Sequence, residues 1–454
     1  METISRYVLL LAIWWVAFFW NHFGDRQQTG ELVSNHFPHW KWLGKKFRIK
    51  DGIYYLYPGA LPFLSTFYPP HFLSAKTQSF KVLNVVCLLH YFFGSVLSFF
   101  LFMKWFSPEV ALFGSLTVTY MASSIKLHNP CIMYTLAWLP GCLMGGWFGA
   151  FSFGMAILGG YWPTLIYFLP FICFLSPISL VGCVIGLPQI YHFARYYKDS
   201  IRYKSKCDKR IGSVPWWRYL NLLGFEWHFP VRGLLYLESE MYLGLIPLFF
   251  MGWHGLVTIG VYIIVTSGMV SPPFRHSCRL LHTMGWAVTF FACQGLTGNI
   301  GLLIAIQAYC LWRNRDLYPM HPFSEHPVDI KTAFDNPLTR YLQRHSGELV
   351  SGLPFPLSTG YTHEFKTCGY TGGMMLKKMA KLRNVTNPNG ESAHDWFRLR
   401  EDAPRSTIFC FRPLDDTSKK GWRKTPVKGL FKHVGHGSIN VNNDHEHSRT
   451  DYSS

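Results

Sequence analysis

Charged residues are scarce in the first two-thirds of this chain, and acidic ones are the scarcest. Residues 1–312 hold 22 Lys and Arg but only 10 Asp and Glu. None of these charges lies clearly inside the long apolar stretches of the region. Ion-coupled transporters generally need an ionisable group at membrane depth, so the absence weakens that class. His90 and His254 are the nearest candidates, and we interpret both as packing and hydrogen-bonding residues.

The chain also lacks the patterns of several other protein classes. Its eleven cysteines include no C-x-x-C pair, and several lie in apolar stretches, so neither a disulfide framework nor a cysteine metal site is expected. There is no internal repeat and no glycine-rich phosphate loop. His36 and His39 form an H-x-x-H pair in a loop, which is weak support for a metal site. We predict no metal ligands and leave the need for a divalent cation open.

What the chain does contain is a series of long apolar stretches. A helix needs roughly 20 apolar residues to cross a bilayer, because backbone polar groups cannot be left unpaired in lipid. About seven stretches qualify, near residues 7–21, 82–103, 110–125, 131–158, 163–188, 241–268 and 281–312. We therefore predict an all-α integral membrane bundle of about seven transmembrane helices over residues 1–312, the first retained as an anchor. Three glycines, Gly295, Gly298 and Gly301, leave open that the last stretch is two short helices.

Most of the acidic residues fall in two long loops. Eight of the ten lie in residues 22–81 or 189–240, which follow the first and fifth predicted spans. An odd number of crossings precedes each loop, so both are expected on one face, together with the turn at 126–130 and the tail. The opposite face should receive only short connectors near Lys104 and Gly160 and the link at 271–279. We expect recognition or chemistry on the face with the long loops.

The formal charge of +18 calls for a partner of opposite sign. The basic residues flank apolar spans, so membrane lipid headgroups or a phosphorylated lipid substrate explain them more simply than nucleic acid, which we do not expect as a partner. The positive-inside rule would place the basic loops in the cytoplasm, but the rule is weaker for long loops. Charge alone therefore leaves the orientation open.

The remainder of the chain has a different composition. Residues 313–428 contain few apolar runs, and we predict a non-membrane C-terminal region of mixed structure. Residues 429–454 are rich in His, Asn, Asp and Ser and are predicted to be a disordered tail.

Six short motifs follow one another between residues 24 and 247. They are Gly24-Asp25; the run GALPFLSTFYPP from Gly59 to Pro70; Asn84 with Leu88-Leu89-His90; His128-Asn129 followed by Ala137-Trp138-Leu139-Pro140; Gly186-Leu-Pro-Gln189 with Ser200-Ile-Arg202; and Tyr242-Leu-Gly-Leu-Ile-Pro247. In this order they resemble the YfhO family of bacterial membrane glycosyltransferases, which resembles the broader GT-C class. Family members usually continue with several more spans than this chain has after residue 312.

The resemblance implies an enzyme that moves a sugar from a polyprenyl-phosphate donor to a glycan, polymer or lipid acceptor outside the cytoplasm. It also implies the inner membrane of a bacterium, with the long loops facing outside. The missing spans leave room for a partner subunit in the membrane.

Glycosyl transfer of this kind needs a carboxylate at the membrane surface that accepts the hydroxyl proton of the acceptor or holds a metal. Asp25 is the first candidate, because it follows the first span and matches the family's loop-start aspartate; the alternative is a solvated loop residue. Asp51 is the second, although Asp51-Gly52 is also an ordinary turn pair. Asp199 could position the acceptor, but an ion pair with Arg202 is the preferred interpretation.

Cationic side chains must neutralise the departing phosphate. Arg195 and Arg202 are candidates for that contact, because a guanidinium can bind two phosphate oxygens at once. Lys126, His128 and Asn129 belong to the short turn on the same face, although Lys126 could equally extend to lipid headgroups.

Two other functions fit the same features. A transporter or flippase of a lipid-linked precursor would use the same basic loops and an apolar groove. A non-catalytic membrane subunit would explain the missing spans. An Asp25→Asn substitution separates an enzyme from a carrier, because only the enzyme should lose function while still inserting.

Overall fold

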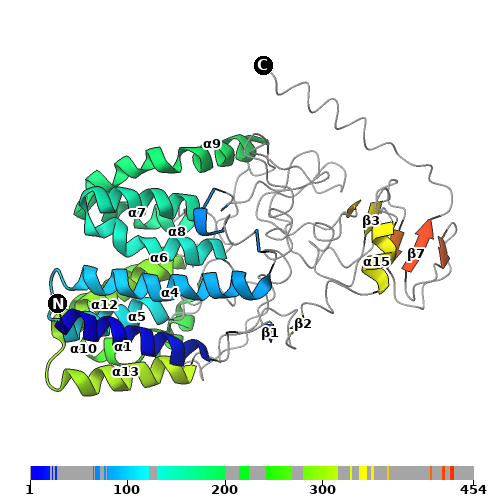
Figure 1. Cartoon of the computed structure of the whole chain (residues 1–454). Helices are drawn as coiled ribbons and strands as arrows, with labels where there is room; N and C mark the ends of the chain where they lie inside the picture. Colours follow the sequence, from blue (N-terminus) through cyan, green and yellow to red (C-terminus); the bar gives the residue numbers. More distant parts are fainter. Residues whose placement is uncertain are drawn as a thin grey trace.

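A computed structural model describes the protein over most of its first 314 residues and over short segments beyond them. The described residues are 2–20, 23, 26–27, 65, 67–71, 76–77, 79–121, 130–199, 214–223, 242–267 and 280–314, followed by 328–329, 337–344, 349–351, 366–367, 409–411, 422–424 and 430–433. This part of the chain is mostly helical, in agreement with the predicted all-α class (Figure 1).

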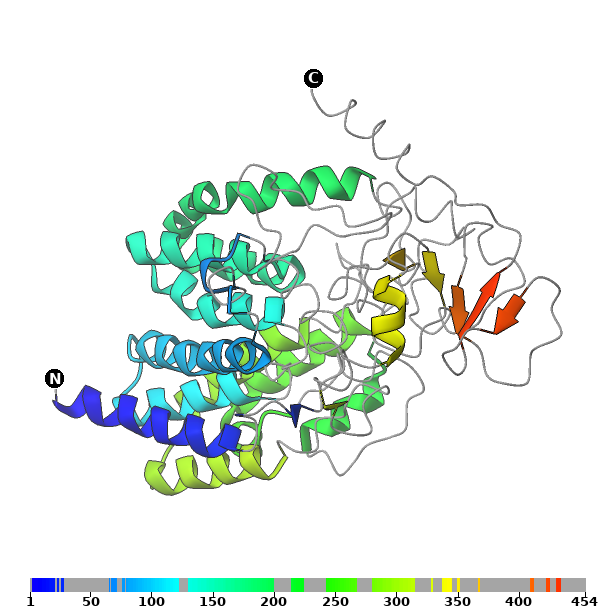
Figure 2. The same ribbon diagram turned by 45° about the vertical axis from the view of Figure 1, so that its right-hand side comes forward.

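The helices lie side by side and pack on one another along their lengths (Figures 1 and 2). They are α1 (Glu2–Phe19), α4 (Phe80–Phe102), α5 (Pro108–Tyr120), α6 (Pro130–Met144), α7 (Gly146–Gly159), α8 (Trp162–Leu175), the 3-10 helix η3 (Pro177–Gly182), α9 (Cys183–Asp199), the 3-10 helix η4 (Trp216–Leu223), α10 (Ile246–Phe250), α11 (Gly252–Thr266), α12 (Leu281–Gly295) and α13 (Ile300–Asn314).

Only one helix among the described residues, Lys81–Phe102 of α4, is long and apolar enough to cross a membrane. Seven further apolar helices are 10–17 residues long. The difference from the predicted long spans arises where the chain reverses inside an apolar stretch, because hydropathy measures composition and does not register a reversal.

The predicted span 131–158 is a helical hairpin. Gly145 and Gly146, with φ of 83° and 61°, turn the chain between α6 and α7, and such positive φ values are easy only for glycine. The far ends of the two helices are joined by Thr135, whose hydroxyl donates to Ala156 O at 3.1 Å and accepts the Tyr161 N–H at 3.0 Å.

The predicted spans 241–268 and 281–312 are also each divided in two. The first turns at Gly252, with φ of 58°, between α10 and α11, and the second turns near Gly298, with φ of 88°, between α12 and α13. The alternative of two short helices for the last stretch is therefore confirmed. The span 163–188 is likewise interrupted, because η3 separates α8 from α9.

With these reversals the described chain runs back and forth eleven times, through α1, α4 to α9, the segment 242–250, and α11 to α13. We call the end that holds residues 103–107, 145–146, 176, 251 and 296–299 the turn end, and the opposite end the loop end. The described flanks of the loops 22–81 and 189–240, of the turn at 122–129 and of the tail all lie at the loop end, and their position on one membrane face stays a prediction. The placements of Gly160 and of the link at 271–279 were wrong. Tyr161 N bonds Thr135 at the loop end, and Thr266, just before the link, accepts a bond from Val214 N.

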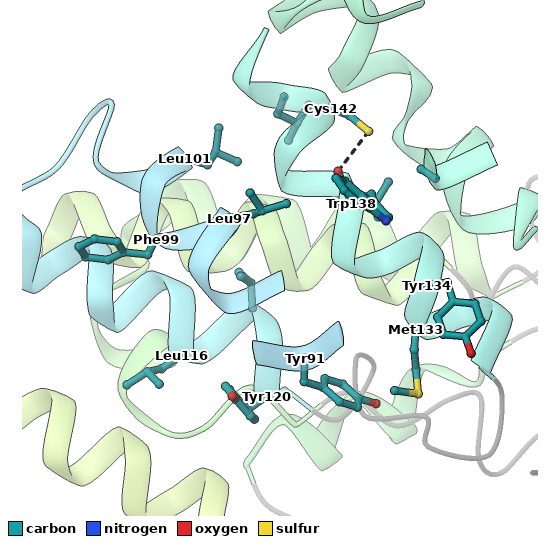
Figure 3. Close-up of a cluster of buried hydrophobic side chains, with 14 of the residues drawn as sticks. Tyr91, Leu97, Phe99, Leu101, Leu116, Tyr120, Met133, Tyr134, Trp138 and Cys142 are labelled. Carbon is teal, nitrogen blue, oxygen red and sulfur yellow. Dashed lines mark hydrogen bonds between the residues drawn. The ribbon is translucent and has the colours of Figure 1, made fainter. Parts of the chain in front are cut away.

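A large apolar core joins α1, α4, α5 and α6 (Figure 3). Tyr91 and Tyr120 stack at 6.5 Å between α4 and α5, and the Ser115 hydroxyl donates to Ser95 O across the same pair of helices at 2.7 Å. A Cβ on Gly94 would lie 3.1 Å from Ala137 Cα, so α4 and α6 approach closely there. Short polar side chains bonded to carbonyls and small residues at crossings are typical of helices that pack in an apolar environment.

The C-terminal region forms a small mixed sheet beside a short helix, α15 (Pro337–Arg344), apart from the helical layer in both views (Figures 1 and 2). Its strands β3 (Leu349–Ser351), β4 (Lys366–Thr367), β5 (Phe409–Phe411), β6 (Trp422–Lys424) and β7 (Leu430–His433) are ordered β4-β3-β5-β7-β6. Strand β7 lies inside the segment 429–454 that was predicted to be disordered, so the prediction fails for residues 430–433.

Candidate functional site

A short part of the first long loop enters the helical layer at the loop end. Ser65 and residues 67–71 lie against α4 and α6, and the Tyr68 and His71 side chains are fully buried there. The Cys131 thiol, at the start of α6, donates to the Ser65 hydroxyl at 3.4 Å. The loop is therefore attached to the helices in its middle as well as at its two ends.

Three aromatic and imidazole groups form a directed chain of hydrogen bonds around Tyr68. The Trp138 indole N–H donates to the Tyr68 hydroxyl at 2.8 Å, and that hydroxyl lies 2.6 Å from His90 Nε2. His90 Nδ1 lies 2.6 Å from Val86 O, which can only accept, so Nδ1 carries the proton and Nε2 accepts from Tyr68. Burial raises the pKa of the Tyr68 hydroxyl, which keeps it protonated and able to donate.

Tyr134 of α6 completes this cluster. Its ring stacks on Tyr68 at 4.7 Å and lies 4.6 Å from the His90 ring, and its hydroxyl is 3.4 Å from His71 Nδ1. The five side chains are held together by aromatic packing and by the hydrogen bonds above, and none carries a fixed charge. We interpret the cluster of Tyr68, His71, His90, Tyr134 and Trp138, called here the anchor cluster, as the device that holds the loop in place.

A small cavity lies next to the anchor cluster, among α4, α5, α6 and α12. Its volume is about 30 Å³, and its lining includes His90, Thr119, Met133, His282 and Trp286. The Trp286 indole donates to His282 Nε2 at 3.3 Å. This space fits one or two waters and is too small for a sugar or a lipid chain. Substrate would therefore have to bind outside this cavity.

The anchor cluster brings together motifs that are distant in the sequence. Tyr68 belongs to the run 59–70, His90 to the motif on α4, and Trp138 to the motif on α6. The motif Tyr242–Pro247 is held separately, because Gln307 Nε2 on α13 donates to Leu243 O at 2.6 Å and to Thr117 Oγ1 at 3.0 Å.

Six of the eight predicted site residues lie outside the described residues. They are Asp25, Asp51, Lys126, His128, Asn129 and Arg202. Arg195 and Asp199 lie in the last two turns of α9, which end at the loop end. Hence no described site contains the predicted catalytic and phosphate-binding side chains together. The described residues next to Asp25, to the turn at 126–129 and to Arg202 lie at the loop end.

The segment that contains Asp25 is bounded by two described contacts. Before it, the Phe23 ring packs edge-on against Trp15 of α1 at 5.2 Å. After it, strand β1 (Arg26–Gln27) pairs antiparallel with strand β2 (Val328–Asp329), with Arg26 opposite Asp329. The C-terminal region thus reaches the first loop directly beside the predicted catalytic aspartate.

The described residues contain no group of three or more His, Cys, Asp or Glu that could hold a metal ion. His36 and His39 fall outside them. Sequence reasoning missed the Tyr68 and Gln307 contacts. Tyr68 belongs to the motif 59–70, but no local pattern indicates that its side chain contacts two helices. For Gln307, the only indication in the sequence is a polar amide within an apolar helix.

No protein-family model matches this sequence, and neither does any curated protein. The resemblance to membrane glycosyltransferases therefore depends on the six short motifs in the sequence.

Proposed function

We propose that the protein is a multi-pass membrane glycosyltransferase that uses a polyprenyl-phosphate sugar as donor and an extracytoplasmic glycan, polymer or lipid as acceptor. The observation that carries the proposal is the anchor cluster. Residues of three of the resembling motifs meet there, and Tyr68 belongs to the same long loop in the sequence as Asp25. The hydrogen bonds of Tyr68 to His90 and Trp138 attach this loop to the loop end, where the other long segments begin and end.

Apolar side chains exposed on the peripheral helices support the membrane location. Members of this set are Leu9, Leu10, Ile13 and Val16 on α1; Val184, Ile185 and Leu187 on α9; Leu256, Val257, Val261 and Ile264 on α11; and Leu302 and Ile306 on α13. Soluble monomers rarely expose contiguous apolar patches of this extent. Lipid chains would cover these faces in a bilayer, which in a bacterium would be the inner membrane with the loop end outside.

In the proposed reaction the acceptor hydroxyl attacks the anomeric carbon of the donor sugar. The new glycosidic C–O bond forms as the bond from that carbon to the phosphate oxygen breaks, and the phosphate leaves with the electron pair. Asp25 takes the hydroxyl proton, with Asp51 as the second candidate. Arg195 and Arg202, aided by the turn at 126–129, neutralise the phosphate.

The reversals in the fold bear on the two rival functions. The partner-subunit rival was based on the spans missing after residue 312, and the reversals lie before that residue, so they do not replace those spans. The transporter rival would need a path outside the cavity beside the anchor cluster, because that cavity is too small for a lipid-linked precursor.

The deciding experiment compares Asp25→Asn with Glu31→Gln, a change of the same kind six residues along the same loop. Both variants are reconstituted in vesicles and supplied with radiolabelled polyprenyl-phosphate sugar. We expect Asp25→Asn to lose transfer by at least about 100-fold, the size typical of a lost general base, while Glu31→Gln retains it. Equal transfer by both variants would refute the role of Asp25. Turnover that starts only after a membrane partner is added would favour the subunit rival, and donor movement without transfer would favour the flippase.

Orientation is tested separately with a membrane-impermeant maleimide. A cysteine placed at Glu31 in a cysteine-free chain should be labelled in spheroplasts without lysis. Labelling only after lysis would place the loop in the cytoplasm, where soluble nucleotide sugars are available, and would contradict the polyprenyl-phosphate donor.

A further inference from the structure

The short helix η4, in the second long loop, has two different faces. Arg218, Tyr219 and Leu222 are buried, whereas Trp216, Leu220 and Leu223 are 69%, 37% and 51% exposed. In a 3-10 helix residues three positions apart lie on one face, so Leu220 and Leu223 form one exposed edge, and Trp216 is exposed at the first residue of the helix. A tryptophan and two leucines exposed within eight residues call for an apolar or interfacial partner.

The buried face fixes η4 to the loop end of α11. Val214 N donates to Thr266 O at 2.8 Å, and the Tyr219 hydroxyl bonds Thr266 Oγ1 at 2.8 Å. Val214, Tyr219 and Leu222 also share an apolar cluster with buried residues of α12. The position of the exposed edge is therefore set by the helices and does not depend on the rest of the loop.

Helix η4 is attached at Thr266, close to the point where the exposed apolar side of α11 ends. Trp253 begins the exposed apolar side of α11, and Ile264 is its last exposed large apolar residue, two positions before Thr266. If lipid chains cover α11 in the proposed membrane location, the headgroup region begins close to Thr266. Tryptophan is the residue that most favours this region, since its ring is apolar and its N–H is polar. The Arg218 guanidinium lies 5.9 Å from the Trp217 ring, within range of a cation–π contact.

A basic run comes directly before η4 in the sequence. Residues 204–210 carry four cations, Lys204, Lys206, Lys209 and Arg210, against the single acid Asp208. A basic run followed closely in the sequence by exposed apolar residues is the pattern that binds anionic lipid headgroups, because the phosphates attract the cations while the apolar side chains insert.

We propose that residues 204–223 form a membrane-surface element, in which the exposed side chains of Trp216, Leu220 and Leu223 insert between the headgroups of the leaflet at the loop end and the basic run binds anionic lipid phosphates. The inference rests on the proposed membrane location but not on the proposed transfer chemistry. It gives η4 a fixed position against the bilayer, at the same end of the helices as the C-terminus of α9.

The test uses a fluorescent probe in vesicles of phosphatidylcholine with or without phosphatidylglycerol. The probe is attached to Leu220→Cys, and to Thr77→Cys as a matched exposed site at the loop end, in a cysteine-free chain. We expect the probe at 220 to be quenched by spin-labelled lipid and protected from iodide at least about threefold relative to 77. Iodide quenching at 220 equal to that at 77 would overturn the proposal. Protection from both iodide and spin-labelled lipid would also overturn it, because protein would then cover the edge.

The binding of the basic run to anionic lipid is measured separately. Neutralising Lys204, Lys206 and Lys209 to glutamine should remove the extra protection that phosphatidylglycerol gives, and salt at 0.5 M should do the same. Protection that is independent of anionic lipid would contradict the role of the basic run. Hydrogen exchange of residues 214–223 in the unsubstituted chain, in nanodiscs of the two compositions, repeats the test without cysteine replacement. Carbonate extraction of the unsubstituted chain checks the membrane location itself.

Discussion

Replacing Gly182 by alanine should loosen the packing of α7 against η3 and α9. A Cβ at this position would lie 1.9 Å from Ala150 O and 2.9 Å from Gly154 N, both backbone atoms of α7. No φ value forbids alanine here, so the effect would come from space alone. Ordinary carbon–oxygen contacts are about 3.3 Å or longer, so the two backbones would have to separate by more than 1 Å at a point where neither side has a rotamer that can move.

The expected cost follows from that geometry. Overpacking costs typically about 1–3 kcal/mol, and a gap of about 1 Å forfeits up to half of the dispersion energy of the atoms that it separates. Because the contact is between two backbones, we place Gly182→Ala at the upper end, about 3 kcal/mol. For a chain of this size that corresponds to a fall of roughly 3 °C in the unfolding midpoint.

The assay is intrinsic tryptophan fluorescence of detergent-solubilised protein during heating, with all variants scanned at one rate. Gly260→Ala is the matched control, since Gly260 lies within α11 and a Cβ there would meet nothing within 4 Å. The control should be neutral or slightly stabilising, because alanine favours a helix by about 1 kcal/mol over glycine. A Gly182→Ala midpoint within about 1 °C of the unsubstituted chain would refute the packing argument.

Three further predictions concern the anchor cluster, a contact at the turn end and the C-terminal region. Tyr68→Phe leaves a buried imidazole nitrogen and an indole N–H without their partner, so it should lower stability by roughly 2 kcal/mol or more in the same melting assay; an unchanged midpoint would mean that the hydroxyl does not hold the loop. The Tyr7 hydroxyl donates to Glu109 and lowers the pKa of that carboxyl below its ordinary 4.5. The stability that this bond contributes is therefore present above about pH 4.5 and is lost as the pH falls through the lower folded pKa. The melting midpoint of Glu109→Gln should not show this loss between pH 3 and 6, and a pH profile identical to that of the unsubstituted chain would contradict the prediction. Cysteines at Arg26 and Asp329, which face each other in register, should form a disulfide on mild oxidation, detected as a mobility shift after cleavage between them; a pair displaced by four residues that forms equally fast would show that the strands are not paired.

The apolar character of residues 1–312 and the gathering of long segments at one end could be predicted from the sequence, because both depend on composition and on order along the chain. The number of reversals could not. In the stretch 131–158, Gly145 and Gly146 look like two more of the small residues that apolar helices tolerate. What makes them a turn is that α6 and α7 can then pack on each other through Thr135 and the backbone near Ala156, and that gain exists only after the chain has folded back.

For the candidate site, too, one part could be predicted from the sequence and another part could not. The predicted residues were chosen for their charge, and charged residues at a loop end are easily found in an apolar sequence. The anchor cluster consists of Tyr68, His90 and Trp138 with neighbours, residues whose partners are 22 to 70 positions away. His90 was interpreted as a packing and hydrogen-bonding residue, and the contact with Tyr68 agrees with that interpretation, but the loop segment that supplies the partner could not be identified from spacing.

The reversals also change what the proposed membrane has to accommodate. Helix α4 has 23 residues, or about 35 Å, whereas α5, α7 and α8 have 13 or 14, or about 20 Å. The hydrocarbon core of a bilayer is about 30 Å thick, and a short segment is accommodated by local thinning or by the ends of its neighbours. Here α5 and α7 are largely enclosed, since nearly all of α5 and most of α7 are buried in the fold. At the loop end, Thr135 of α6 bonds backbone groups of Ala156 and Tyr161, so protein and not lipid satisfies that end of α7. Helix α8 differs, because Phe171, Phe174 and Leu175 are exposed. In the proposed membrane location a bilayer would therefore meet mainly the outer faces of α1, α8, α9, α11 and α13, and its local thickness would depend on these helices and on the level at which η4 is held.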